Sequence, residues 1–152
     1  MKRRILLFAL LGSALFWQAE SSAGDDVIAV IANKDVPQNK LSRDDLRPIF
    51  QATKTQWSNG ATIVPLNLPE DNSMRKGFDS AVLGLDPDRV ARYWIDRKIR
   101  GDARPPKKLS SPGAVLKAVG KTGGAIGYVA LGDVDASVKV VAKIKGGNVV
   151  AP

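Results

Sequence analysis

Apolar runs of strand length divide the chain and predict four strands. The run Val27–Ala32 is apolar throughout, which is typical of a strand covered on both faces, so we expect a central strand there. A second strand is predicted at 62–68, where Pro65 favours an edge or a bulge because it cannot donate to a strand ladder. Two more strands are predicted at 125–129 and 138–144, the last with partial alternation.

Apolar positions at helical spacing lie between these runs and predict four helices. The first begins at Ser42, which is followed three residues later by Asp45, an acidic variant of the capping box. Pro48 lies past the first turn of this helix, where it removes a backbone hydrogen bond, so we expect a kinked or two-part helix. The predicted helices are 42–50, 74–83, 87–100 and 113–120.

The order β, α, β, α, α, α, β, β predicts an α/β fold rather than a helical bundle or a β barrel. We expect a mixed sheet of about four to five strands flanked by helices. The 152 residues have the length of about one domain, and they show no internal repeat and no long linker. One α/β domain is therefore expected over 24–152.

The first residues predict export. Met1–Arg4 is a short basic head, the apolar run Ile5–Trp17 follows, and small residues lead to Ala23. This is the pattern of a secretory signal peptide over 1–23, cleaved near Ala23. The alternative is a membrane anchor, but the apolar run is shorter than the roughly 20 residues that span a bilayer as a helix. The expected location is the periplasm.

The amino-acid composition limits the kinds of catalytic and metal-binding site that the chain can form. The chain has neither Cys nor His, which excludes thiol nucleophiles, Ser-His-Asp triads and zinc-finger spacings. Acidic pairs at 44–45 and 86/88 lie at predicted helix starts, where the helix dipole favours carboxylates. We therefore expect no catalytic residue, no metal and no cofactor, and an enzyme is the weakest hypothesis.

The charge balance points to anionic partners. The chain has 23 Lys and Arg against 15 Asp and Glu, a net charge of +8. Because an exported protein seldom meets nucleic acid, an anionic ligand, anionic lipid or an acidic protein is favoured and nucleic acid is not expected. The basic residues at 97–108 are typical of a solvated face, and attachment to an anionic membrane surface is the alternative.

Two neighbouring aromatic residues could stack on a ligand or fill the core. Tyr93 and Trp94 fall on one apolar stripe of the helix at 87–100, together with Val90 and Ile95. Such a stripe is more often core than a ligand platform. We therefore expect this side of the helix to face the core.

Three blocks of the sequence, in the same order, resemble the substrate-binding component of phosphate ABC transporters. The blocks are Leu46–Phe50 with Trp57, Glu70–Arg75 with Phe78, and Gly123–Val129. The last block, Gly-Gly-Ala-Ile-Gly-Tyr-Val after a predicted helix, is the most specific. The resemblance covers about residues 27–145 and implies the type II periplasmic binding protein fold, with roughly one lobe of the family's two-lobed clamshell.

The phosphate signature of that family is matched in part. In the family an acidic residue precedes Gly-Ser-Gly-Thr-Arg at a helix start, where amides and hydroxyls face the anion. Glu70, Arg75 and Phe78 keep the pattern. Residues 71–74 depart from it, and Leu68 replaces an arginine expected two residues before the acid, which removes a charge-assisted contact to phosphate.

The resemblance and the helix starts together indicate a candidate anion site. Asn72 and Ser73 open a helix whose free amides and positive dipole end lie near Arg75. Ser110 and Ser111 open a second helix that could face the same cleft. The alternative at both starts is that these side chains only cap the helix and bind no ligand.

Two functions are compatible with these features. The first is an exported, noncatalytic solute-binding protein that binds phosphate or a similar small oxyanion. The second is a periplasmic protein-interaction module with a vestigial anion site, which docks on a membrane sensor, porin or transporter. Whether two copies pair to rebuild a two-lobed cleft stays open.

Overall fold

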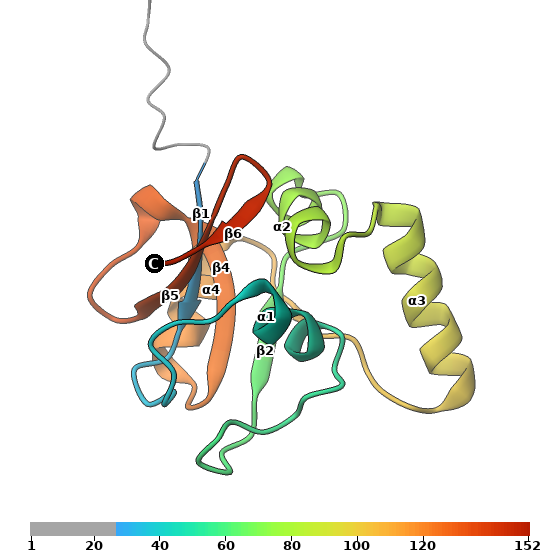
Figure 1. Ribbon diagram of the computed structural model, residues 1–152, viewed down its shortest axis with the longest axis horizontal. Helices are drawn as coiled ribbons and strands as arrows, with labels where there is room; N and C mark the ends of the chain where they lie inside the picture. The colour runs from blue at the N-terminus through green and yellow to red at the C-terminus, as the bar shows by residue number, and fades with distance from the viewer. Residues whose placement is uncertain (1–26) are drawn as a thin grey trace, which may run out of the picture.

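The computed structural model describes residues 27–152, and the predicted signal peptide at 1–23 lies outside them. β1 (Ile28–Ala32) is an inner strand of a six-stranded sheet with the order β3-β2-β4-β1-β5-β6. It pairs antiparallel with β4 (Ala125–Ala130) on one side and with β5 (Lys139–Lys145) on the other (Figure 1). Its last four residues are buried, which confirms the central strand predicted from the unbroken apolar run.

The remaining strands make the sheet mixed, as predicted. β2 (Val64–Asn67) runs parallel to β4 and to the two-residue strand β3 (Lys107–Lys108). β6 (Asn148–Val150) pairs antiparallel with β5. The pattern of apolar residues does not predict β3 or β6, because each strand is too short to show a periodicity of its own. The sheet therefore has six strands, one more than the upper end of the expected range.

Pro65 lies in β2 where the strand has a neighbour on one side only. β2 pairs with β4 at Val64 and Pro65, and with β3 at Leu66 and Asn67. The Val64 amide donates to the Gly124 carbonyl, so the nitrogen of the next residue points to the opposite edge, where β3 has not begun. The missing N–H of Pro65 therefore removes no ladder hydrogen bond. β2 itself is an inner strand, so the predicted edge holds at this residue and not for the strand as a whole.

Capping residues begin the helices. Ahead of α1 (Arg43–Phe50), the Ser42 hydroxyl accepts from the Asp45 amide and the Asp45 carboxylate accepts from the Ser42 amide, which confirms the capping box. Of the predicted kinked or two-part helix, the two-part form is wrong, because α1 is one helix of eight residues. It ends at Phe50, so Pro48 lies in its last turn, where a proline interrupts little further helix.

The other three helices also have the predicted caps. Asn72, Asp86 and Ser111 accept first-turn amides, and Gly84 and Gly101 end two of the helices in the left-handed region. The helices are α2 (Ser73–Leu83), α3 (Pro87–Arg100) and α4 (Pro112–Lys121). Within 27–152 none of the helices has the length and apolar character needed to cross a membrane.

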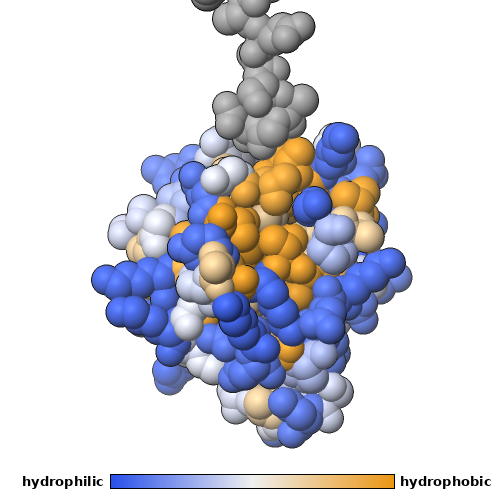
Figure 2. All heavy atoms as spheres, turned by 90° about the vertical axis from the view of Figure 1, so that its left-hand side faces the viewer, coloured by the Kyte–Doolittle hydropathy of each residue, from blue (hydrophilic) through white to orange (hydrophobic). Residues whose placement is uncertain are grey.

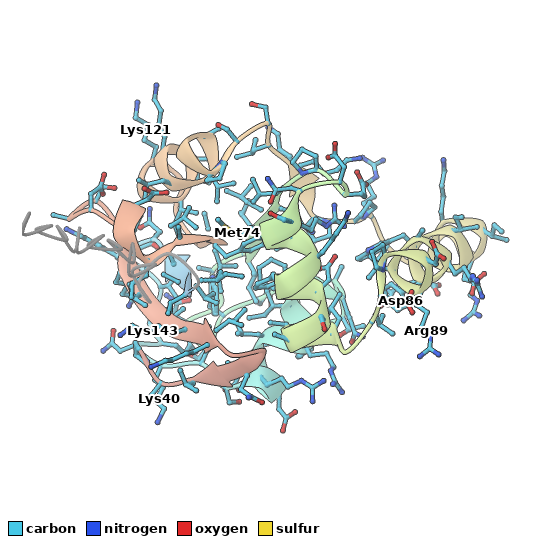
Figure 3. All side chains as sticks on the ribbon, turned by 90° about the horizontal axis from the view of Figure 1, so that it is seen from above. Lys40, Met74, Asp86, Arg89, Lys121 and Lys143 are labelled. Atoms are coloured by element: carbon cyan, nitrogen blue, oxygen red, sulfur yellow. The ribbon has the colours of Figure 1, made fainter. Side chains whose placement is uncertain are left out.

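Helices cover both faces of the sheet (Figures 1 and 3). On the α4 side, a Cβ atom added to Gly127 of β4 would lie 2.6 Å from the Val115 side chain. The neighbouring Tyr128 points to the opposite face, where its ring stacks on Phe78 of α2 with 4.0 Å between centroids. Phe50 of α1 packs edge-on against Phe78 at 4.6 Å. The core therefore has two halves, and the glycine lets α4 approach β4 closely.

α3 stands at the side of the molecule, beyond α2 (Figures 1 and 3). Val90 is its buried residue, Tyr93 and Trp94 are half-buried, and Ile95 and Ile99 are 56% and 80% exposed. The predicted core stripe is therefore wrong at Ile95 and only partly filled at the two aromatic residues. The reason is that α3 packs along one side only, so its apolar stripe is wider than the contact that covers it.

Hydrophobic residues also reach the surface on the side opposite α3. Figure 2 shows a band of them between hydrophilic residues. Within 27–152 the most exposed large hydrophobic residues are nevertheless Ile95 and Ile99 of α3 and Val150 of β6. Among the helices described, α3 therefore has the uncovered apolar side.

Candidate functional site

Two helices begin at one edge of the sheet. β2 and β3 are parallel neighbours, α2 follows β2, and α4 follows β3. The Leu109 amide, directly after β3, donates to the Asn67 carbonyl at the end of β2 over 2.9 Å. Open α/β sheets commonly bind ligands outside the carboxyl ends of their parallel strands. The two predicted helix-start sites therefore lie at the edge where a ligand is expected.

At these helix starts, two of the predicted site residues act as caps. Asn72 Oδ1 accepts hydrogen bonds from two first-turn amides at 2.9 and 3.3 Å, and Ser111 Oγ accepts from one at 3.2 Å. Ser73 and Ser110 lie beside them and are exposed. A capping side chain satisfies amides that an anion would otherwise use. Capping therefore accounts for Asn72 and Ser111, while both neighbouring serines face solvent.

Arg75, in the first turn of α2, is a buried cation with three partners. Its Nε donates to Asp79 Oδ2 over 3.2 Å, and its Nη1 donates to the Leu68 carbonyl over 2.9 Å and lies 3.6 Å from Glu70 Oε1. The side chain is 5% exposed. Nη2 makes no hydrogen bond with another residue in 27–152, and it is not fully enclosed. One end of the guanidinium is therefore held by the protein, and the other is available.

Two carboxylates reduce the positive potential around Arg75. Burial raises the pKa of Asp79, and the nearby Arg75 charge opposes that rise. A hydrogen bond of 2.9 Å from Lys108 lowers the pKa of Glu70, which lies at an exposed position. The ionised form of Glu70 is therefore favoured, and it competes with an incoming anion for both Lys108 and Arg75.

Leu68 stands where the resemblance places a second arginine. It is fully buried, its carbonyl accepts from Arg75, and its amide lies near the buried Tyr128 hydroxyl. A charged side chain here would enter the core and lose its hydration. Core packing therefore replaces the charge-assisted contact at this position.

A cavity of about 230 Å³ opens beside Arg75. α2, α3 and the segment Pro105–Pro106 line it. Of the predicted site residues Arg75 lines this cavity, whereas Asn72, Ser73, Ser110 and Ser111 do not. Glu70, Asp79 and Lys108 line the cavity together with Arg75, and they are not among the predicted site residues.

Two of these three residues have a sequence signal. Glu70 belongs to the partly matched phosphate signature. Asp79 lies four residues after Arg75 on a predicted helix, the spacing at which opposite charges meet. Lys108 and Trp94 have no such signal, because they reach the cavity from β3 and α3 through long-range packing. In the described part of the chain, no cluster of three acidic side chains is placed to hold a metal ion.

A family model described as a PBP superfamily domain matches residues 16–151. No curated protein matches the chain significantly.

Solved structures share the fold at low sequence identity. An ABC-type phosphate transport receptor from Vibrio cholerae matches with a TM-score of 0.60 and 21% identity over 75% of this chain and 44% of the receptor. A putative phosphate ABC transporter substrate-binding protein with bound phosphate from Clostridium perfringens matches with a TM-score of 0.62 and 23% identity over 80% of this chain and 45% of that protein. PstS from Borrelia burgdorferi matches with a TM-score of 0.57 and 14% identity over 76% of this chain and 46% of PstS. The chain spans less than half the length of each.

Proposed function

The chain belongs to the PBP superfamily, and on that premise we propose that it is an exported, noncatalytic solute-binding protein that binds phosphate or a similar small oxyanion near the start of α2. Arg75 would donate from Nη2. Ser73 and Ser110, which are exposed beside the two caps, would add polar contacts, with Asn72 and Ser111 holding the two turns in place.

One observation carries this proposal: Arg75 is a buried arginine with an end that no residue in 27–152 pairs with. Its three partners all lie on Nε and Nη1. Two N–H groups on Nη2 are therefore preorganised toward an acceptor, and a guanidinium fork suits oxyanions. The positive end of the α2 dipole favours the same charge.

The same geometry predicts modest affinity. Asp79 neutralises much of the Arg75 charge, and Glu70 already occupies Nη1 and Lys108. An anion must compete with these carboxylates and lacks the arginine that Leu68 replaces. We therefore expect micromolar or weaker binding that falls with ionic strength.

Calorimetric titration of residues 24–152 with phosphate at low salt, with sulfate as comparison, tests this function. Arg75→Lys keeps a cation beside Asp79 but removes the fork, and it should weaken phosphate binding about tenfold, or ~1.4 kcal/mol. Arg89→Ala is the control, because Arg89 is an exposed arginine near the start of α3 that pairs with Asp86. No heat up to millimolar phosphate, or equal losses in both variants, contradicts the proposal.

Export and location are part of the same proposal. A signal peptide over 1–23 would deliver the chain to the periplasm, where the expected partner is a membrane transporter. Mass spectrometry of the secreted protein should find Gly24 at its N-terminus. A protein that retains Met1–Ala23 in the cell envelope would support an anchor instead.

A second function, docking on a membrane sensor, porin or transporter, is favoured by α3. Ile95 and Ile99 are exposed on this helix, whose last turn carries Arg97, Lys98 and Arg100. An apolar pair beside a basic cluster suits an acidic protein surface. Photo-crosslinking from position 99 in intact cells should yield a membrane protein, and crosslinking from position 143 on β5 should not. Equal yields from both positions exclude α3 as the docking site.

A further inference from the structure

The cavity beside Arg75 has one charged end and a largely apolar remainder. Its apolar walls come from α3, with Val90, Ala91, Trp94 and Ile95, and from Pro105 and Pro106 of the segment before β3. The charged residues belong to α2 and its neighbours, and they are Glu70, Arg75, Lys76, Asp79 and Lys108. A ligand that fills this space must therefore combine a charged group with an apolar group.

The charged end favours an anion. It holds three cationic side chains and two carboxylates. Asp79 is occupied by Arg75 Nε, and Glu70 Oε1 lies 2.9 Å from Lys108 Nζ. Lys76 forms no ion pair within the described residues, and Arg75 keeps Nη2 free. The unsatisfied donors at this end are thus cationic.

The volume is too large for an inorganic oxyanion alone. A cavity of 150 Å³ with apolar walls accepts benzene, so about 230 Å³ has space for a ring or short chain together with a charged head. With inorganic phosphate bound at Arg75, the apolar side chains of α3 and the two prolines would remain in contact with water. An apolar substituent on the anion would displace that water.

We propose that this cavity binds a small organic oxyanion, of the class of a phosphate monoester or phosphonate with a compact apolar substituent. The oxyanion pairs with Arg75 Nη2 and Lys76, and the substituent lies between Trp94 and Pro105–Pro106. This inference rests on the proposed function, because it uses the same Arg75 as the anion-binding group. The two proposals differ in the ligand, because the apolar substituent of an organic oxyanion adds affinity that inorganic phosphate does not have.

Trp94 makes the occupied state observable. It is half-buried and lines the cavity, whereas Trp57 is 3% exposed and donates to the Gly124 carbonyl in the core. A ligand on the Trp94 ring changes the environment of that indole and leaves the environment of Trp57 unchanged. Tryptophan fluorescence therefore reports on the cavity, and Trp94→Phe should remove the signal.

The test compares phenyl phosphate with inorganic phosphate on residues 24–152. Phenyl phosphate should bind at least tenfold more tightly and change the Trp94 fluorescence. Ala91→Leu fills the apolar part of the cavity from an exposed position on α3. It should abolish the preference for phenyl phosphate over inorganic phosphate. Ser80→Leu is the control, since it places the same side chain on exposed α2 surface outside the cavity.

The outcomes separate the two proposals. Equal affinity for both probes, or a preference that survives Ala91→Leu, overturns the cavity assignment and leaves the phosphate function standing. Binding of phenyl phosphate without measurable phosphate binding supports the cavity and overturns the phosphate function. Binding of neither probe overturns both.

Discussion

Arg75 and Asp79 form a buried salt bridge one turn apart on α2, with 3.2 Å between Nε and Oδ2 and with side chains that are 5% and 7% exposed. The arginine that is best placed to bind an anion is thus also part of the core. A substitution that removes it changes both binding and folding. Tests of the site must therefore separate the two effects.

Removing either partner alone should destabilise the protein strongly. Arg75→Met and Asp79→Leu should each lower the free energy of unfolding by roughly 3–5 kcal/mol, because each leaves an uncompensated buried charge. The double variant should lose much less than the sum, since it leaves neither charge. Urea unfolding of the four proteins measures this coupling. Additive losses would mean that the two side chains do not depend on each other.

The Arg75→Met variant should also gain stability on acidification relative to its value at pH 7. Burial raises the pKa of Asp79, and Arg75 is the group that opposes this rise. Without the arginine the pKa of Asp79 in the folded state rises further above its value in the unfolded state, so stability rises as pH falls toward the ordinary Asp pKa of 3.8. Urea midpoints between pH 7 and pH 4 measure the slope. If the urea midpoints of the variant and the wild type changed equally with pH, the Asp79 carboxylate of the variant would be solvated rather than buried.

The capping box at α1 should have the opposite pH dependence. Hydrogen bonds from Ser42 lower the pKa of Asp45, so its stabilising contribution is present above the ordinary pKa of 3.8 and is lost as pH falls through the lower folded value. Asp45→Ala should cost roughly 0.5–1 kcal/mol at pH 7 and almost nothing near pH 2. Asp44→Ala, in the same turn, removes an equal charge without a capping bond and should cost less at pH 7.

Features that depend on neighbouring residues could be predicted from the sequence. The Ser42–Asp45 box, the Asp86 cap before Pro87 and the Gly84 helix end are all local, and all are confirmed. β3 could not be predicted, because its two residues become a strand only by pairing with Leu66 and Asn67.

The candidate site could be predicted only in part for the same reason. The resemblance and the helix start together predict Arg75, but the cavity beside it depends on how α3 and Pro105–Pro106 pack. Helical periodicity shows that the side of α3 with Trp94 and Ile95 is apolar. It does not show which part of that side a neighbour covers, and for this reason the predicted core position of Ile95 is wrong.

Gly124 should be far less tolerant of a side chain than Gly101, although both have a φ of +72°. A Cβ atom on Gly124 would lie 2.1 Å from the backbone oxygen of Thr62, whereas one on Gly101 meets nothing within 4 Å. Gly101→Ala should cost about 1 kcal/mol from backbone strain alone. Gly124→Ala should cost roughly 3 kcal/mol or more, because the β2–β4 contact must also shift. Comparable losses in thermal unfolding would show that the Thr62 contact relaxes freely.

α3 offers a matched pair that separates packing from exposure. Val90 is 4% exposed and Ile99 is 80% exposed, on the same helix. Val90→Ala removes two methyl groups from a packed site and should cost about 1.5 kcal/mol or more. Ile99→Ala should change the free energy of unfolding by less than about 0.5 kcal/mol, since it removes no described contact and alanine is the better helix former. Chemical unfolding of both variants measures the difference. A large loss for Ile99→Ala in the isolated protein would mean that a second copy of the chain covers this side of α3, and that loss would then decrease as the protein is diluted.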